Sequence, residues 1–168
     1  MKQIIKFLAI AVVILAFSGA ANAQTVTATS QAAAMIVAPL TITNTAGLHF
    51  GTIMRGATAG TVTVETDGDR TFTGGVTLSP INPVHTVATF TIEGEAGRAY
   101  TIDLPASINI TGAGDPMAVA TFVSDPAEGT YTPVGVSTTL LVGATLSVAA
   151  DQAAGLYTGT FDVSVNYN

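Results

Sequence analysis

Few residues in this chain have types suited to catalysis or metal binding, and their spacing argues against both. His49 and His85 lie in different segments, and neither has an acidic residue or a second histidine at the spacing of metal ligands. A lone histidine at the end of a strand is usually solvated or packed. We therefore predict that neither histidine is catalytic and that the chain holds no metal.

The acidic residues come closest to a ligand motif at Asp67-Gly68-Asp69. This run resembles the start of a calcium loop, but the later oxygen ligands and the terminal glutamate are missing. A turn between two strands accounts for it equally well. Glu93 and Glu95 flank Gly94, which places them beside a turn rather than across a cleft. With no nucleophile elbow and no phosphate-binding glycine loop, the sequence predicts no enzyme and no cofactor.

The first 23 residues have the organisation of a secretory signal peptide. Lys2 and Lys6 form a short basic region, an apolar run follows from Phe7 to Phe17, and Ala21-Asn22-Ala23 is a cleavage site. We expect the mature chain to begin at Gln24, to lack a membrane span, and to reach the periplasm, the cell surface or the medium. A membrane-anchoring helix is the alternative interpretation of this segment.

The charge of the expected mature chain excludes some partners. Both lysines belong to the signal peptide, so three arginines face eleven acidic residues, and the net charge is 3 − 11 = −8. Without a basic patch, the chain should bind neither nucleic acid nor anionic lipid through electrostatics. It has no cysteine, so its stability must come from burial alone.

Short apolar–polar alternations separated by turn residues predict an all-β fold. Turns recur every 8–12 residues, Asp67-Gly68 is a strong hairpin turn, and we identify no convincing helix. The expected strands after the N-terminal stretch are 40–43, 48–54 with a bulge at Gly51, 61–65, 70–73, 74–78, 86–93, 98–104, 107–111, 117–123, 138–149 and 157–167, with a surface loop over 124–136. Residues 24–168 should form one antiparallel β-sandwich, immunoglobulin-like or pilin-like; a closed barrel is the alternative.

The last expected strand is unusually regular. One face carries Tyr157, Gly159, Phe161, Val163, Val165 and Tyr167, and the other face carries polar residues. Eleven residues at about 3.3 Å each span roughly 36 Å, about twice the usual strand length.

The expected mature chain also opens with an alternating segment, from Thr25 to Val37. One parity carries small or apolar side chains: Val26, Ala28, Ser30, Ala32, Ala34 and Ile36. Helix competes as an interpretation across Gln31–Met35, but the β-branched residues that precede it favour a strand. We therefore interpret residues 24–37 as a possible donor strand for a neighbouring subunit.

The edges of the sheets suggest how such a protein is used. Proteins usually protect exposed strand edges with lysine, proline or short strands, and the mature chain has no lysine. An unprotected edge suits strand addition by a partner. The alternative is that both terminal strands pair within their own sandwich.

Several runs together resemble the bacterial secreted family known as domain of unknown function 4402. They are residues 36–43, 48–53, 74–78, 100–105 and 155–168. The resemblance implies export and a β-rich fold. A looser resemblance, to chaperone–usher pilins and spore-coat-protein-U-like subunits, rests on Gly155, the row Phe161, Val163 and Val165, and the penultimate Tyr167. It implies a periplasmic chaperone and neighbouring subunits as partners. Two departures are the missing disulfide and the small side chains of the N-terminal stretch.

These observations predict an exported, non-catalytic structural protein. The preferred role is a surface or fimbria-like subunit assembled by β-strand complementation. The alternative is a monomeric secreted binding module, for example for a surface glycan.

Overall fold

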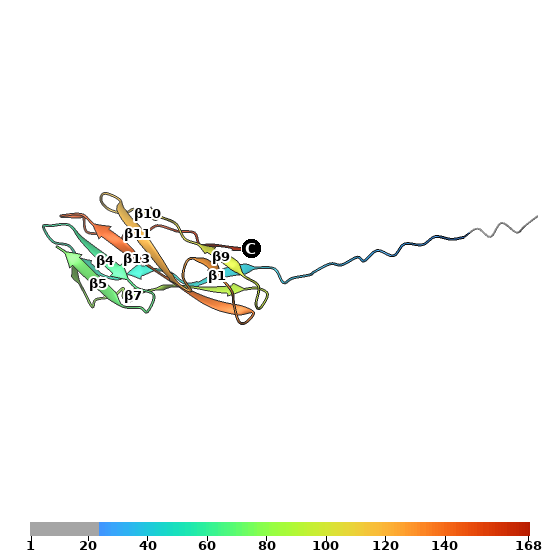
Figure 1. Ribbon diagram of the computed structural model, residues 1–168. Coiled ribbons are helices and arrows are strands. Elements are labelled where there is room, and N and C mark those ends of the chain that lie inside the picture. Colours follow the sequence, from blue (N-terminus) through green and yellow to red (C-terminus); the bar gives the residue numbers. More distant parts are fainter. Residues whose placement is uncertain (1–23) are drawn as a thin grey trace, which may run out of the picture. The chain divides into compact units, whose positions relative to one another are not determined.

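The computed structural model describes residues 24–168, so the predicted signal peptide lies outside the described residues. Within them the fold is all-β and antiparallel, without a helix, as the sequence predicted (Figure 1). The compact unit begins at Ile36. Its strands are β1 (Thr41–Ala46), β2 (His49–Phe50), β3 (Ile53–Met54), β4 (Gly60–Val64), β5 (Arg70–Gly74), β6 (Thr77–Leu78), β7 (His85–Thr86), β8 (Ala88–Glu93), β9 (Tyr100–Asp103), β10 (Ser107–Ile110), β11 (Met117–Asp125), β12 (Gly129–Tyr131), β13 (Ser137–Val148) and β14 (Ser164–Tyr167).

Strand β13 is the centre of the largest sheet, whose order is β1-β8-β13-β11-β10. Along one edge, β13 pairs first with β8, over Ser137–Val142, and then with β4, over Ala144–Val148. Strand β11 pairs along its other edge, and β5 pairs with β4. Gly143 lies at the change of partner, where a Cβ atom would overlap the carbonyl oxygen of Val64. Only glycine allows the two partner strands to meet at this point.

Two apolar cores follow from this change of partner. The first lies against the second half of β13 and includes Val62, Val76, Val119, Leu146 and Val148. The short ladders β2–β7 and β3–β6 contribute partly buried side chains to it. The second core lies against the first half of β13 and includes Ile92, Tyr100, Ile102, Leu140 and Val142. Each fully buried aliphatic side chain contributes about 1.5–3 kcal/mol relative to an exposed one.

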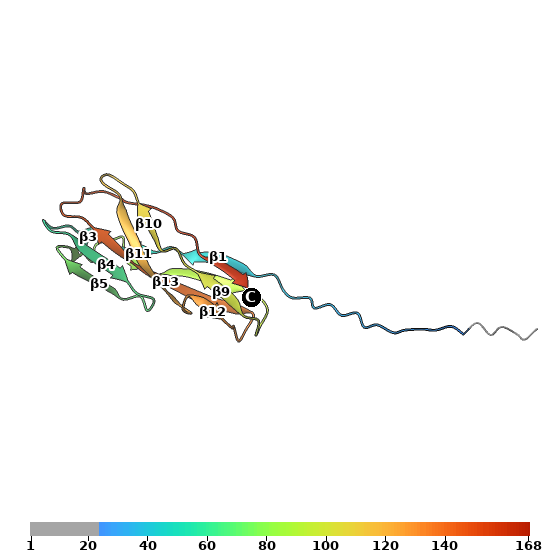
Figure 2. The same cartoon turned by 45° about the horizontal axis from the view of Figure 1, so that its top comes forward.

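A separate three-stranded sheet, of order β12-β9-β14, closes the second core from the opposite side. Figure 2 shows β9, β12 and the C-terminal strand together, with β1 of the large sheet beside the C-terminus. Two sheets that face each other across one apolar core form a sandwich-like arrangement.

The hairpin predicted at Asp67-Gly68 joins β4 and β5. Gly68 has φ of 90°, its amide donates to the carbonyl of Glu65, and the amide of Asp69 donates to Asp67 Oδ1. These hydrogen bonds are those of a turn.

Gly51, with φ of 73°, divides the predicted strand 48–54 into β2 and β3. The predicted loop 124–136 was partly wrong, because it contains β12, which pairs with β9.

The strand predicted over Thr25–Val37 was wrong for the isolated chain. None of these residues belongs to a β-ladder, and nearly all are exposed. A strand forms only as part of a ladder with a neighbouring strand, and these residues lie outside every ladder of the described chain.

Candidate protein–protein interface at the C-terminal strand

The C-terminal segment lies along both cores of the compact unit. Tyr157 is partly buried against the first core, and Phe161, Val163, Val165 and Tyr167 against the second. The intervening polar residues are exposed, as is Gly159. The predicted alternation of faces is therefore confirmed, apart from the exposure of Gly159.

The predicted eleven-residue ladder was wrong in length. Strand β14 pairs with β9 only from Ser164 to Tyr167, and a single bridge joins Thr158 to Thr111 further back. Between these points, residues 159–163 lie opposite residues 104–110, so the register slips by two. The opposite stretch contains Pro105, which has no amide hydrogen to donate. The extra residues and the proline interrupt the pairing.

Aromatic contacts hold the middle of the C-terminal segment in place. The Phe161 ring lies 6.2 Å from that of Phe90, nearly edge-on, and 5.1 Å from that of Phe122. Edge-to-face and offset ring pairs add about 0.5–1.5 kcal/mol beyond the burial of their area. Phe161 therefore joins this segment to β8 and β11.

The penultimate tyrosine closes the end of the domain. The Tyr167 hydroxyl accepts a hydrogen bond from the amide of Glu95 at 2.7 Å and donates one to the carbonyl of Ala38 at 3.1 Å. The carboxylate of Glu95 accepts a hydrogen bond from the amide of Ala38 at 3.1 Å. The guanidinium of Arg98 lies 5.4 Å from the Tyr167 ring centre, within the range of a cation–π contact. Sequence reasoning missed Ala38, Glu95 and Arg98, since no local pattern links them to Tyr167.

A glycine supports this end of the domain. A Cβ atom on Gly94 would lie 2.6 Å from the Tyr167 hydroxyl and 2.9 Å from Leu40 Cδ1. Gly155, the glycine singled out in the sequence, lies at the other end of the segment, where a Cβ atom would lie 2.8 Å from that of Ala113. Both glycines allow the segment to approach the domain closely.

One edge of β14 remains open. The strand is the last in the order β12-β9-β14, so β9 occupies one edge only. The amide of Asn168 donates to the carbonyl of Ala99, so these two residues form a hydrogen-bonded pair. Such pairs occur at every second residue of an antiparallel ladder, so the backbone groups of Asn166 and Ser164 also point toward β9. The backbone groups of Val165 and Tyr167 therefore point away from β9. Strand β1, also at the edge of its sheet, runs beside this open edge without a ladder between the two (Figure 2).

The candidate donor residues Val26, Ala28, Ala32, Ala34 and Ile36 all lie in the stretch outside the ladders. Val26 is 87% exposed and Ile36 is 94% exposed. The structure does not bring these residues together with a strand partner.

The residues considered for chemistry have structural contacts. His49 Nδ1 accepts a hydrogen bond from the amide of Gly51, and His85 Nε2 bonds with the carbonyl of Gly68. Strands β2 and β7 pair His49 with Thr86 and Phe50 with His85, so the two imidazoles lie on opposite faces of the ribbon. Across residues 24–168, no three His, Cys, Asp or Glu side chains are grouped as a metal site would need. The same residues contain no helix long and apolar enough to cross a membrane.

Comparison with known proteins identifies the family. No curated protein and no solved structure matches the chain. A family model described as Domain of unknown function (DUF4402) matches residues 40–167, a region that includes both cores and the whole apolar row of the C-terminal segment. The chain therefore belongs to the DUF4402 family.

Proposed function

We propose that the protein is an exported, non-catalytic structural subunit of a surface or fimbria-like assembly. Subunits join when residues 24–36 of one copy pair as a strand with the open edge of β14 in another copy. A periplasmic chaperone covers the same edge before assembly.

The observation that carries this proposal is the coexistence of two incomplete elements. Residues 24–36 are exposed, lie outside every ladder of the described chain and contain neither glycine nor proline. Strand β14 has an open edge whose side chains Val165 and Tyr167 are only partly buried. An extended segment and an open edge are the two components of strand addition.

The two faces of the extension differ in a way that an experiment can use. Ala32 and Ala34 lie on the parity that would face the receiving subunit, whereas Gln31 and Ala33 lie on the opposite parity. The paired variants Ala32→Asp, Ala34→Asp and Gln31→Asp, Ala33→Asp add the same charge to the same segment. Since these residues lie outside the compact unit, neither variant should alter its folding.

Surface protein sheared from cells, run unboiled on a denaturing gel, provides the test. The parent and the Gln31→Asp, Ala33→Asp variant should give a ladder of multimers. The Ala32→Asp, Ala34→Asp variant should give monomer, because two buried carboxylates would oppose pairing. A single monomer band from all three proteins, or equal ladders from all three, would contradict the proposal.

A further inference from the structure

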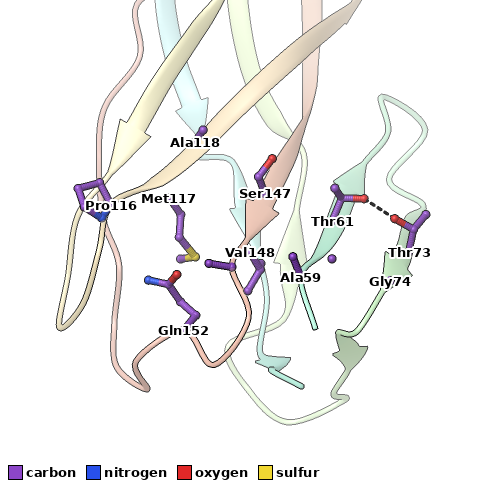
Figure 3. A pocket seen from close by; sticks show the side chains of 12 residues that line it. Ala59, Thr61, Thr73, Gly74, Pro116, Met117, Ala118, Ser147, Val148 and Gln152 are labelled. Carbon is purple, nitrogen blue, oxygen red and sulfur yellow. Dashed lines mark hydrogen bonds between the residues drawn. The ribbon is translucent and has the colours of Figure 1, made fainter. Parts of the chain in front are cut away.

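A hollow at the end of the large sheet has the properties of a binding site. None of its lining residues belongs to β14, the proposed assembly edge. The hollow lies where β4, β5, β11 and the end of β13 meet, and has a volume of about 510 Å³. Ligand sites in proteins commonly range from about 300 to 1,000 Å³. Figure 3 shows Thr61 and Thr73 on one side of this hollow and Met117 and Gln152 on the other.

The polar group that points to a ligand is the side chain of Gln152, which is only 7% exposed. Its Nε2 donates to the carbonyl of Asp115 at 2.7 Å and to the Tyr157 hydroxyl at 3.0 Å. These two bonds use both hydrogens of the amide and fix its orientation. The Oε1 atom has no hydrogen-bond partner among the described residues, and Figure 3 shows it on the side of Met117, in the lining of the hollow. Oε1 is accessible from the hollow and is free to accept a hydrogen bond from a ligand or from water.

Hydroxyl groups lie on the opposite side of the hollow. Thr61 and Thr73 face each other across β4 and β5, with their hydroxyl oxygens 2.8 Å apart. Ser147 is the partner of Thr61 across β13 and is exposed. Because only one hydrogen is used between the two threonines, the three hydroxyls can still donate and accept hydrogen bonds.

The remaining lining selects against charge. No Asp, Glu, Lys, Arg or His is among the residues that line this hollow in the described chain. Pro116 and Ala118 are exposed and provide apolar surface, whereas Met117 and Val148 belong to the first core; Gly60 and Gly74 leave the sheet face without side chains. An anionic ligand such as a phosphate or carboxylate would lose its hydration without gaining a cation in return.

We infer that this hollow binds a neutral pyranose unit of a saccharide. A pyranose ring has apolar C–H faces, which suit Pro116 and Ala118. Its rim of hydroxyls can donate to Gln152 Oε1 and exchange hydrogen bonds with Ser147 and Thr61. Ligands typically gain about 0.3 kcal/mol of binding free energy per non-hydrogen atom, so one sugar unit should have a dissociation constant on the order of 1 mM. This site is independent of the proposed strand exchange, since it uses none of the same residues.

The test is an amide ¹H–¹⁵N NMR titration of the purified protein. The probes are glucose, galactose and N-acetylglucosamine, with glucose 6-phosphate as a charged counterpart. We expect saturable shifts at the amides of Gly60, Ser147 and Gln152 with at least one neutral sugar, and weaker or no shifts with the phosphate. No saturable shift at these amides with any of the three neutral sugars would overturn the inference, as would preferential binding of the phosphate.

Substitutions separate this site from unspecific binding. Ala118 is exposed and lines the hollow, so Ala118→Arg should fill it and abolish the shifts. Ser147→Ala should weaken binding about fivefold, the effect of one hydrogen bond. Thr43→Ala, an exposed threonine of β1 outside the hollow, is the matched control and should bind as the parent does. Unchanged binding by a folded Ala118→Arg variant would place the sugar elsewhere and contradict the assignment.

Discussion

The hydroxyl oxygen of Tyr167 lies 3.1 Å from the carbonyl oxygen of Ala38, although 129 positions separate the two residues in the chain. The same hydroxyl accepts the amide hydrogen of Glu95. The side chain of Tyr167 is therefore hydrogen-bonded to the backbone of the segment that leads into β1. The family match, residues 40–167, begins two residues after Ala38 and ends at Tyr167.

Removal of this hydroxyl should loosen the end of the domain. We expect Tyr167→Phe to lower the free energy of unfolding by about 1 kcal/mol, because two partly solvated hydrogen bonds are lost. Urea denaturation followed by circular dichroism measures this change. Tyr131→Phe is the matched control, since no hydrogen bond to the Tyr131 hydroxyl occurs within the described residues, and it should change stability by less than half as much. Equal losses from both variants would show that the Tyr167 hydroxyl has no particular role.

The Phe161 ring should be the main apolar anchor of the C-terminal segment. We expect Phe161→Ala to cost about 2–3 kcal/mol in unfolding free energy, because its contacts with Phe90 and Phe122 are lost and a cavity remains. Phe72, on the edge strand β5, is 47% exposed, so Phe72→Ala should cost less than about 1 kcal/mol. Thermal or urea unfolding of the two variants provides the comparison. A larger loss from Phe72→Ala would contradict the assignment of Phe161 to the core.

Gly143 should tolerate no side chain. A methyl group there would overlap the carbonyl of Val64, at the point where β13 exchanges β8 for β4. We expect Gly143→Ala to cost about 3 kcal/mol, since the backbone of one strand must shift. Gly47→Ala is the control, because a Cβ atom at Gly47 has no neighbour within 4 Å. Similar denaturation midpoints for both variants would rule out the close approach at Gly143.

Tyr100 should make stability sensitive to alkaline pH. Burial raises the pKa of its phenol above the ordinary value of 10.0. The unfolded chain then loses this proton at a lower pH than the folded chain does. The contribution is therefore fully present below about pH 10 and decreases as the pH rises above it.

The variant Tyr100→Phe isolates this effect. Its unfolding free energy should fall less steeply above pH 10 than that of the parent, as measured by urea denaturation at a series of pH values. At neutral pH the variant should be about as stable as the parent, because the buried Tyr100 hydroxyl has only the Thr138 side chain nearby and makes no hydrogen bond of good geometry with it. An identical pH dependence in both proteins would show that Tyr100 does not titrate differently on folding.

Local patterns in the sequence were sufficient for the fold class and for much of the candidate interface. Strict alternation specified which side chains of the C-terminal segment face the core, and Phe161, Val165 and Tyr167 lie there as predicted. The hairpin at Asp67-Gly68 was equally local, because turn geometry depends on a few neighbouring residues. Such features can be read from sequence because the period of a strand is a property of the backbone.

Pairing partners were decided only by the tertiary structure. The alternation in residues 157–167 and in 25–37 looks alike, yet the first segment lies on two cores, and the second belongs to no ladder of the described chain. An alternating pattern indicates that a segment can form a strand, whereas the strand's ladder depends on a neighbour far away in sequence. The same reason explains why Gln152, Ser147 and Thr61 line one hollow and why Tyr167 contacts Ala38: long-range strand order, not local pattern, places these residues together.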